Sequence, residues 1–351
     1  MIKLKYTSTK AKKTFLVIAG IFTILFSLFI IGVESQAQNT ALGVDILPIR
    51  IAYDPVNKSM YLADPRNDSV SVINTTNNKV VGSPAPVGGW PVGIAYDPVN
   101  KAIYVAGNNS VYVIDTTNNK VVGSPLKVQT VPGGMAYDND TKRMYVTNPS
   151  LNSISVIDTS NNKVVGSPIT VGGLPLGIAF DPVNKRMYVT NFFNDTVSLI
   201  DTAKNTVVGS PITVEKSPYG IAYDPVNKRM YVVNQLSDTV SFININTTSS
   251  TVVGSSIAVG DGPHGIAYDP VNKRMYVTNN FDNSVSVIDT TNNKVVGGPI
   301  TVGSRPTEIA YDPVNKRMYV ANASVNNISV IDTTKNTVVS IPVLVGAVLP
   351  H

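Results

Sequence analysis

The sequence contains no cysteine, one tryptophan (Trp90) and two histidines (His264 and His351). Without cysteine, no disulfide can stabilise the fold and no thiolate can act as a nucleophile or a metal ligand. Two histidines, one of which ends the chain, are too few for a histidine metal cluster, and only His264 remains as a base for a catalytic serine. The sequence therefore predicts no catalytic residue set, no metal site and no cofactor.

Acidic residues are absent from the start of the chain, where the first one is Glu34. Five lysines precede it, at positions 3, 5, 10, 12 and 13, and they account for the formal net charge of +5. The other 23 basic residues equal the 23 acidic ones in number. Because nucleic-acid binding requires a clustered excess of lysine and arginine, we expect no nucleic-acid partner.

The only long apolar run covers residues 14–33 and carries no charge. As a helix it would span about 30 Å, enough to cross a bilayer, and the lysines before it would stay inside. Two interpretations remain open for residues 1–37: an uncut N-terminal membrane anchor, or a signal peptide cleaved near Ala37. Both predict a hydrophobic helix, a linker over 38–46, and an extracytoplasmic location for the rest. Membrane contact is expected through this segment alone.

Export makes N-glycosylation possible, and the sequence holds nine Asn-X-Ser/Thr sequons. Turns rich in asparagine and threonine also generate this pattern by chance, so the sequons permit modification without establishing it. They lie at Asn57, Asn67, Asn74, Asn108, Asn139, Asn194, Asn246, Asn322 and Asn327.

The rest of the chain repeats one pattern seven times, with steps of between 41 and 45 residues. Each copy has a short apolar strand ending in Tyr or Phe, a turn close to Asp-Pro-Val-Asn-Lys, and a strand close to Arg-Met-Tyr-Val-Thr-Asn. A period in the forties built of short strands is typical of a β-propeller. We therefore predict an all-β, seven-bladed propeller over residues 47–351, with blades that start near 47, 90, 131, 174, 217, 262 and 305.

Blade four shows how one repeat divides into four antiparallel strands, A to D. Strand A is expected over 175–180, strand B over 186–191, strand C over 196–201 and strand D over 206–214. Strand D is interrupted by Gly209-Ser210-Pro211, which only an edge strand tolerates. Each blade is apolar on both faces and must pack against its neighbours.

The strand B motif is specific enough to suggest a family. Met-Tyr-Val-Thr-Asn occurs at 144–148, 187–191 and 275–279, with close variants in the other copies. The pattern resembles the YVTN-repeat β-propellers of archaeal and bacterial surface-layer and other exported proteins. This resemblance implies a seven-bladed, extracytoplasmic propeller and brings no catalytic signature.

Differences between the copies indicate where function could reside. The A–B and C–D turns are nearly constant, which indicates turn chemistry. The D–A and B–C loops vary, and variable loops on a rigid scaffold are suited to binding. We predict a ligand site at the channel mouth on this face, formed by Trp90, Tyr219, His264 and Arg305. The alternative is that these are unselected rim residues.

One further pair breaks the pattern within strand A. Five copies place glycine after the variable residue that follows the D–A proline, but the first copy has Arg50 and the last has Glu308. These two blades meet where the ring closes, so we predict a salt bridge at the seam. If exposed, such a pair would contribute about 0–1 kcal/mol.

Three classes of function fit these observations to different degrees. The best supported is a non-catalytic binding module at the cell surface, with a protein or a glycan as its partner. A structural protein of the cell envelope is the alternative. A lactonase- or lyase-like enzyme is the third, and it would need a channel-mouth metal held by Asp64 and the asparagines that end strand B.

Overall fold

The computed structural model describes residues 50–129, 131–245, 250–325, 327–339 and 343–344. These residues belong to one unit of the chain, Leu47–His351, and a second unit covers Met1–Ile46. The predicted apolar helix, cleavage site and linker lie outside the described residues, as do the start of the first blade and Asn246. In the part that the structure describes, no helix has the length and apolarity needed to cross a membrane.

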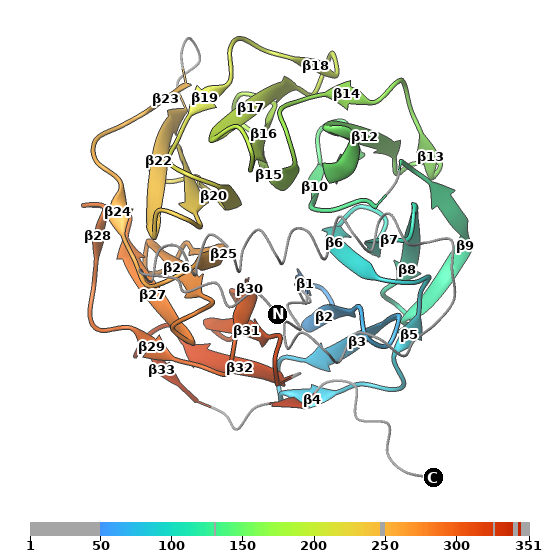
Figure 1. Cartoon of the computed structure of the whole chain (residues 1–351). Helices are drawn as coiled ribbons and strands as arrows, with labels where there is room; N and C mark the ends of the chain where they lie inside the picture. Colours follow the sequence, from blue (N-terminus) through green and yellow to red (C-terminus); the bar gives the residue numbers. More distant parts are fainter. Residues whose placement is uncertain (1–49, 130, 246–249, 326, 340–342, 345–351) are drawn as a thin grey trace, which may run out of the picture. The chain divides into compact units, whose positions relative to one another are not determined.

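Seven antiparallel sheets are arranged around a common centre (Figure 1), which confirms the predicted all-β propeller. Each blade is built from the consecutive strands A, B, C and D of one repeat, and none of the described strands pairs outside its own blade. The A strands lie innermost, where a segment of small and apolar residues of the Gly-Ile-Ala type lies close to the centre. They are β1 (Arg50–Asp54), β6 (Pro91–Asp97), β10 (Met135–Asp138), β15 (Pro175–Asp181), β20 (Pro218–Asp224), β25 (Pro263–Asp269) and β30 (Pro306–Asp312).

Strands B and C form the middle of every blade and are almost fully buried. The B strands are β2 (Ser59–Asp64), β7 (Ala102–Gly107), β11 (Arg143–Asn148), β16 (Arg186–Asn191), β21 (Arg229–Asn234), β26 (Arg274–Asn279) and β31 (Arg317–Asn322). The C strands are β3 (Ser69–Asn74), β8 (Ser110–Asp115), β12 (Ser153–Asp158), β17 (Thr196–Asp201), β22 (Thr239–Ile245), β27 (Ser284–Asp289) and β32 (Asn327–Asp332). A 3-10 turn, η1 (Pro149–Leu151), follows strand B of blade three.

The outer strand D is split in six of the seven blades. In blade four, β18 (Thr206–Val207) and β19 (Ile212–Thr213) both pair with β17, on either side of the predicted Gly-Ser-Pro interruption. Blade two keeps one strand, β9 (Lys120–Lys127). The other pairs are β4 (Lys79–Val80) with β5 (Ala85–Pro86), β13 (Lys163–Val164) with β14 (Ile169–Thr170), β23 (Ser250–Val252) with β24 (Ile257–Ala258), β28 (Lys294–Val295) with β29 (Ile300–Thr301), and β33 (Thr337–Val338) with β34 (Val343–Leu344).

The core consists of apolar clusters between neighbouring blades. The two-residue period of strand B directs Met187 and Val189 towards blade three and Tyr188 towards blade five. The same arrangement joins the last blade to the first, where Tyr319 of β31 packs with Met60 of β2. The ring is therefore closed by side-chain packing of the same kind that joins its other blades.

Wherever the C–D turn of the next blade is described, the buried tyrosine of strand B donates a hydrogen bond to an asparagine of that turn. The Tyr145 hydroxyl donates to Asn205 Oδ1 at 2.6 Å, and Tyr319 makes the equivalent bond to Asn78 across the seam at 2.6 Å. Asn205 and Asn78 lie in C–D turns with φ of 55° and 57°, a region that asparagine tolerates well. The constant C–D turn thus serves the fold.

The two faces of the ring are formed by different connections. The side formed by the A–B and C–D turns is called the A–B face. Its turns touch where Asn57 Nδ2 donates to the Thr116 carbonyl of the next blade at 2.8 Å. The side formed by the D–A loops and the B–C turns is called the D–A face. These segments touch where the Trp90 amide donates to Asp68 Oδ1 at 2.7 Å.

Candidate functional site

The central cluster, which we define as Arg50, Tyr219, His264 and Glu308, occupies the D–A end of strands β1, β20, β25 and β30. Arg50 Nη1 donates to Glu308 Oε1 across the seam, so the structure brings the two predicted seam residues together. Their side chains are 14% and 16% exposed. The pair is therefore mostly buried, and the small contribution expected of an exposed pair does not apply to it.

Tyr219 and His264 lie against each other on the adjacent blades five and six. Their ring centroids are 3.8 Å apart at an interplanar angle of 41°, and both side chains are buried. The Arg50 guanidinium carbon lies 5.7 Å from the centroid of the Tyr219 ring, within reach of a cation–π contact. Phe192 of the B–C turn in blade four contacts Tyr219 edge-to-face at 6.4 Å.

The backbone of blade seven fixes the imidazole of His264. Its Nδ1 lies 3.1 Å from the Thr307 carbonyl and 3.8 Å from Glu308 Oε1. A carbonyl can only accept, so Nδ1 carries the proton and Nε2 keeps the lone pair. This hydrogen bond selects the Nδ1–H tautomer of the neutral ring.

Burial dominates the electrostatics of this cluster. It lowers the pKa of His264 to about 3, with Arg50 adding to the effect and the Thr307 carbonyl opposing it. Burial also raises the pKa of Glu308 and of Tyr219, in both cases against the nearby charge of Arg50. For Arg50 itself, burial acts to lower the pKa, but Glu308 and Tyr219 outweigh it and the net change is upward.

The equivalent positions in blades two, three and four carry no polar side chain. They hold Val92-Gly93, Gly133-Gly134 and Leu176-Gly177. A Cβ added to Gly177 would lie 2.2 Å from the Tyr219 carbonyl oxygen of the next blade, and the other strand A glycines are similarly crowded. Glycine is therefore required where neighbouring A strands approach closely, and Arg50 and Glu308 occur only at the seam.

Trp90 and Arg305 occupy a different part of the D–A face. Each precedes the D–A proline with a positive φ, 61° and 53°, and donates its amide to a B–C side chain, Asp68 or Asn283. Trp90 is 36% exposed, and the Arg305 guanidinium carbon lies 5.8 Å from the Phe281 ring centroid. Among the described residues, no hydrogen bond, ion pair or ring contact joins either of them to the central cluster.

The structure thus unites two of the four predicted mouth residues, Tyr219 and His264, with the predicted seam pair. Sequence comparison between the blades found all four residues but treated them as two separate features. It gave no role to Phe192 or to the Thr307 carbonyl, since the first was one of several variable loop residues and the second acts through its backbone.

The sequon asparagines differ in their exposure. Asn67, Asn108, Asn139 and Asn194 are exposed, and Asn74 is half-buried. Asn57 is exposed, but its Nδ2 donates to both Asp54 and the Thr116 carbonyl. The other described sequon residues, Asn322 and Asn327, are buried. Glycosylation of these last two would require an unfolded blade seven.

The residues considered for a lactonase-like metal site, Asp64 and the asparagines that end strand B, make hydrogen bonds within their own blades. Within the described ranges, no group of three His, Cys, Asp or Glu residues is placed to hold an ion. The asparagines that end strand B lie within their own blades, where Asn191 Nδ2 donates to Thr196 and Ser198 of strand C, both at 2.9 Å. They link two strands.

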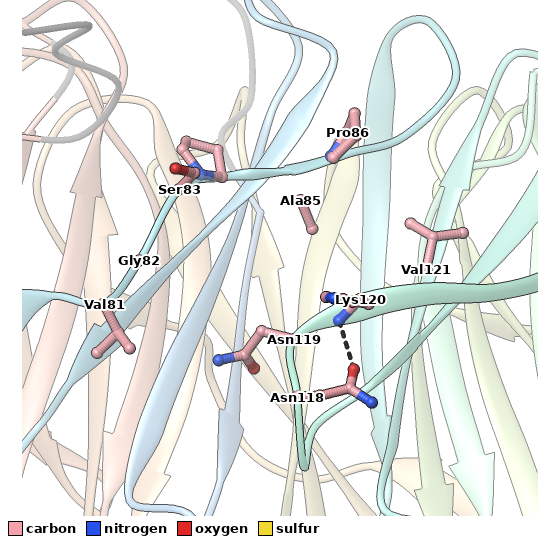
Figure 2. A pocket seen from close by; sticks show the side chains of 10 residues that line it. Val81, Gly82, Ser83, Ala85, Pro86, Asn118, Asn119, Lys120 and Val121 are labelled. Carbon is pink, nitrogen blue, oxygen red and sulfur yellow. Dashed lines mark hydrogen bonds between the residues drawn. The ribbon is translucent and has the colours of Figure 1, made fainter.

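A separate open recess of about 580 Å³ lies at the outer edge of blades one and two (Figure 2). It is lined by residues 81–86, which run from the end of β4 into β5, and by residues 118–121 of the next blade. Among the lining residues, Lys120 supplies the only charge, and its amide donates to Asn118 Oδ1 at 2.9 Å. With no convergent polar groups, the recess is a weaker candidate than the central cluster.

A sequence model of the family described as "Lactonase, 7-bladed beta-propeller" matches residues 106–296 and 221–339. The two matched segments overlap, as expected for a chain whose repeats fit several blades of the family pattern. Neither segment reaches Arg50. No curated protein sequence matches the chain significantly.

Solved structures with this fold include a chain of Kuenenia stuttgartiensis hydrazine synthase. It superposes with a TM-score of 0.72 at 21% identity, over 85% of this chain and 99% of that one. A functionally unknown protein from Desulfotomaculum acetoxidans superposes with a TM-score of 0.61 at 17% identity, over 71% of this chain and 84% of that one. At these identities, the likeness concerns the fold alone.

Proposed function

The chain belongs to the lactonase family of seven-bladed β-propellers, and from its fold and its central cluster we propose that it is a non-catalytic binding module. Its site is the D–A end of the ring centre, where Arg50, Tyr219, His264 and Glu308 meet. We further propose that the module is exported and acts at the cell surface on a protein or a glycan. The uncharged run over residues 14–33 supports export.

The observation that carries this proposal is the convergence of four dissimilar side chains from four blades of an otherwise repetitive ring. The opposite blades offer glycine, valine and leucine at the same positions, so one side of the centre is polar and aromatic and the other apolar. Arg50 Nε is buried and has no hydrogen-bond partner among the described residues. A buried donor of this kind favours a ligand that brings an acceptor.

Family membership makes lactone hydrolysis the second candidate, and the cluster contains residue types that could support it. His264 would activate water through Nε2, and Arg50 would stabilise the developing oxyanion. Two properties of the site weigh against this reaction. A pKa of about 3 makes the imidazole a weak base at neutral pH, and the charge of Arg50 is already paired with Glu308. Binding fits the geometry better.

The test is a thermal-shift screen of the full chain against neutral and acidic mono- and oligosaccharides and aliphatic and aromatic lactones. We expect at least one sugar to stabilise the protein. The affinity for that sugar should fall at least about tenfold in Tyr219→Leu, because this variant loses an aromatic contact. Trp90→Ala, outside the central cluster, serves as the matched control and keeps its affinity.

The outcomes separate the two candidates. Turnover of a lactone by the wild-type protein that is lost in His264→Gln would establish the enzyme and overturn the binding proposal. A ligand whose affinity is the same in the wild type and in Tyr219→Leu would place the binding site elsewhere on the ring.

A further inference from the structure

The A–B face exposes a ring of apolar side chains at the tips of its turns. Six blades place valine third in the turn Asp-Pro-Val-Asn-Lys, after a proline that is also exposed. The valine is half or more exposed in each: Val56 57%, Val99 50%, Val183 57%, Val226 51%, Val271 51% and Val314 51%. A recurrent apolar residue in the most exposed part of a turn requires an explanation other than the core.

The fold does not depend on these valines, because the aspartate holds the turn. In blade four, Asp181 Oδ1 accepts from the Val183 amide at 2.9 Å, and its Oδ2 accepts from Asn184 Nδ2 at 2.7 Å. Blade three carries Asp140 in place of the valine, and Asp138 makes the corresponding bonds to Asp140 and Thr141, at 2.9 and 2.7 Å. The turn therefore forms equally well with a polar tip.

Cations surround this ring of valines. Each A–B turn ends in an exposed lysine, five B strands begin with a half-buried arginine, and six C–D turns add a lysine. They are Lys58, Lys101, Lys142, Lys185, Lys228, Lys273 and Lys316; Arg143, Arg186, Arg229, Arg274 and Arg317; and Lys79, Lys120, Lys163, Lys204, Lys294 and Lys335.

The acidic residues of this face are fewer, and most are engaged in the turns. The aspartate that opens each A–B turn is fully buried, and those of the C–D turns, such as Asp115, accept hydrogen bonds from their own turn residues. The described part of the D–A face shows the reverse balance. Its basic residues are Arg50, Arg66, Lys127, Lys216 and Arg305, and its acidic ones are Asp64, Asp68, Asp195, Glu215, Asp238, Asp261, Asp282 and Glu308.

We propose that the A–B face docks onto an anionic lipid bilayer. The valines enter the interface between lipid headgroups, and the surrounding lysines and arginines contact the phosphates. A basic face alone would suit a soluble polyanion equally well, but such a polymer has no apolar region in which valine tips could be buried. The combination of apolar tips and cations on one face favours lipid. This adds a second membrane contact to the one expected through residues 14–33.

The absence of cysteine provides a direct test on the full chain. Val183→Cys on the A–B face and Phe193→Cys on the D–A face each introduce one thiol at an exposed position, 57% exposed in both cases. Each is labelled with an environment-sensitive fluorophore and mixed with vesicles of phosphatidylcholine, alone or with phosphatidylglycerol. Comparison of two positions in the same chain removes the contribution of residues 14–33, which are common to both.

We expect iodide quenching of the label at position 183 to fall at least about threefold on anionic vesicles, and to recover at high salt. The label at position 193 remains accessible. Adding Val56→Ser, Val226→Ser and Val314→Ser to the Val183→Cys chain restores its quenching, whereas Val164→Ser and Val207→Ser, on outer strands, leave the protection intact.

Two results would overturn the proposal. One is a label at position 183 that stays accessible to iodide on anionic vesicles, or that is protected no more than the label at position 193. The other is protection by soluble dextran sulfate that survives the serine substitutions, which would identify an anionic polymer as the partner.

Discussion

Arg50 and Glu308, from the first and the last described A strands, form an ion pair across the seam of the ring. Five other blades carry glycine at the equivalent position, because the backbone of the next blade leaves no room for a side chain. Among the described strands, none pairs with a strand of another blade, so no backbone pairing is seen at the seam. The pair therefore adds a polar contact to the apolar cluster around Met60 and Tyr319 that closes it.

Removal of one partner of this pair should destabilise the protein more than removal of both. Glu308→Gln leaves the mostly buried Arg50 without its counter-charge, and we expect a loss of about 3 kcal/mol in the free energy of unfolding. Arg50→Gly combined with Glu308→Gly restores the pattern of the other blades and should cost less than the single change. Urea unfolding of the two single glycine variants and the double gives the coupling energy, and a coupling below about 0.5 kcal/mol would show that the pair is not used in closure.

Gly177→Ala tests the close approach of neighbouring A strands. The added Cβ would lie 2.2 Å from the Tyr219 carbonyl oxygen, so the blades must separate, and we expect a loss of about 2–3 kcal/mol. Gly298→Ala is the matched control, since nothing lies within 4 Å of its Cβ position and blade four has Ser210 there. Equal melting temperatures for the two variants would contradict this packing.

Much of the fold could be predicted because each repeat contains the strand and turn patterns of one complete blade. The predicted B and C strands of blade four, 186–191 and 196–201, coincide with β16 and β17. The pre-proline conformation of the D–A loops could not be predicted, since Trp90, Leu174 and Arg305 share a positive φ without sharing a side chain. Tertiary hydrogen bonds from the B–C turns impose it.

The sequence predicted the candidate site as two separate features, the mouth residues and the seam pair, and the geometry of the ring brings members of both together. Blade-to-blade comparison identified Tyr219 and His264 as unusual, but it could not show that Arg50, in blade one, lies over the Tyr219 ring of blade five. That contact crosses the centre of the ring, and sequence separation carries no information about it. The A–B face was attributed to turn chemistry, which explains its aspartates and asparagines and leaves its valines unexplained.

Tyr145→Phe measures the hydrogen bond that joins blade three to blade four. The hydroxyl donates to Asn205 Oδ1 at 2.6 Å from a fully buried position, and its loss should cost about 1 kcal/mol. Tyr112→Phe is the control, because Tyr112 is half-buried and no hydrogen bond of its hydroxyl is found in the described residues. We expect urea midpoints to differ between the two variants; coincident midpoints would mean that the interblade bond has no net stabilising effect.

Acidification should destabilise the protein through His264. Burial lowers the pKa of this imidazole to about 3 in the folded state, against about 6.5 when unfolded, so below pH 6.5 only the unfolded state takes up the proton. The stability present above pH 6.5 is lost progressively as the pH falls towards 3, at up to about 1.4 kcal/mol per pH unit.

His264→Gln isolates this effect, because Arg50, Glu308 and Tyr219, the other titratable groups that face the ring, remain in place. We expect the wild type to lose about 2 kcal/mol more than the variant between pH 7 and pH 5, measured by urea unfolding at each pH. Glu308 titrates in the opposite sense, since burial raises its pKa in the folded state, but its contribution is common to both proteins. Parallel pH profiles for the two proteins would show that the imidazole is protonated within the fold, and that Arg50 and burial do not keep it neutral.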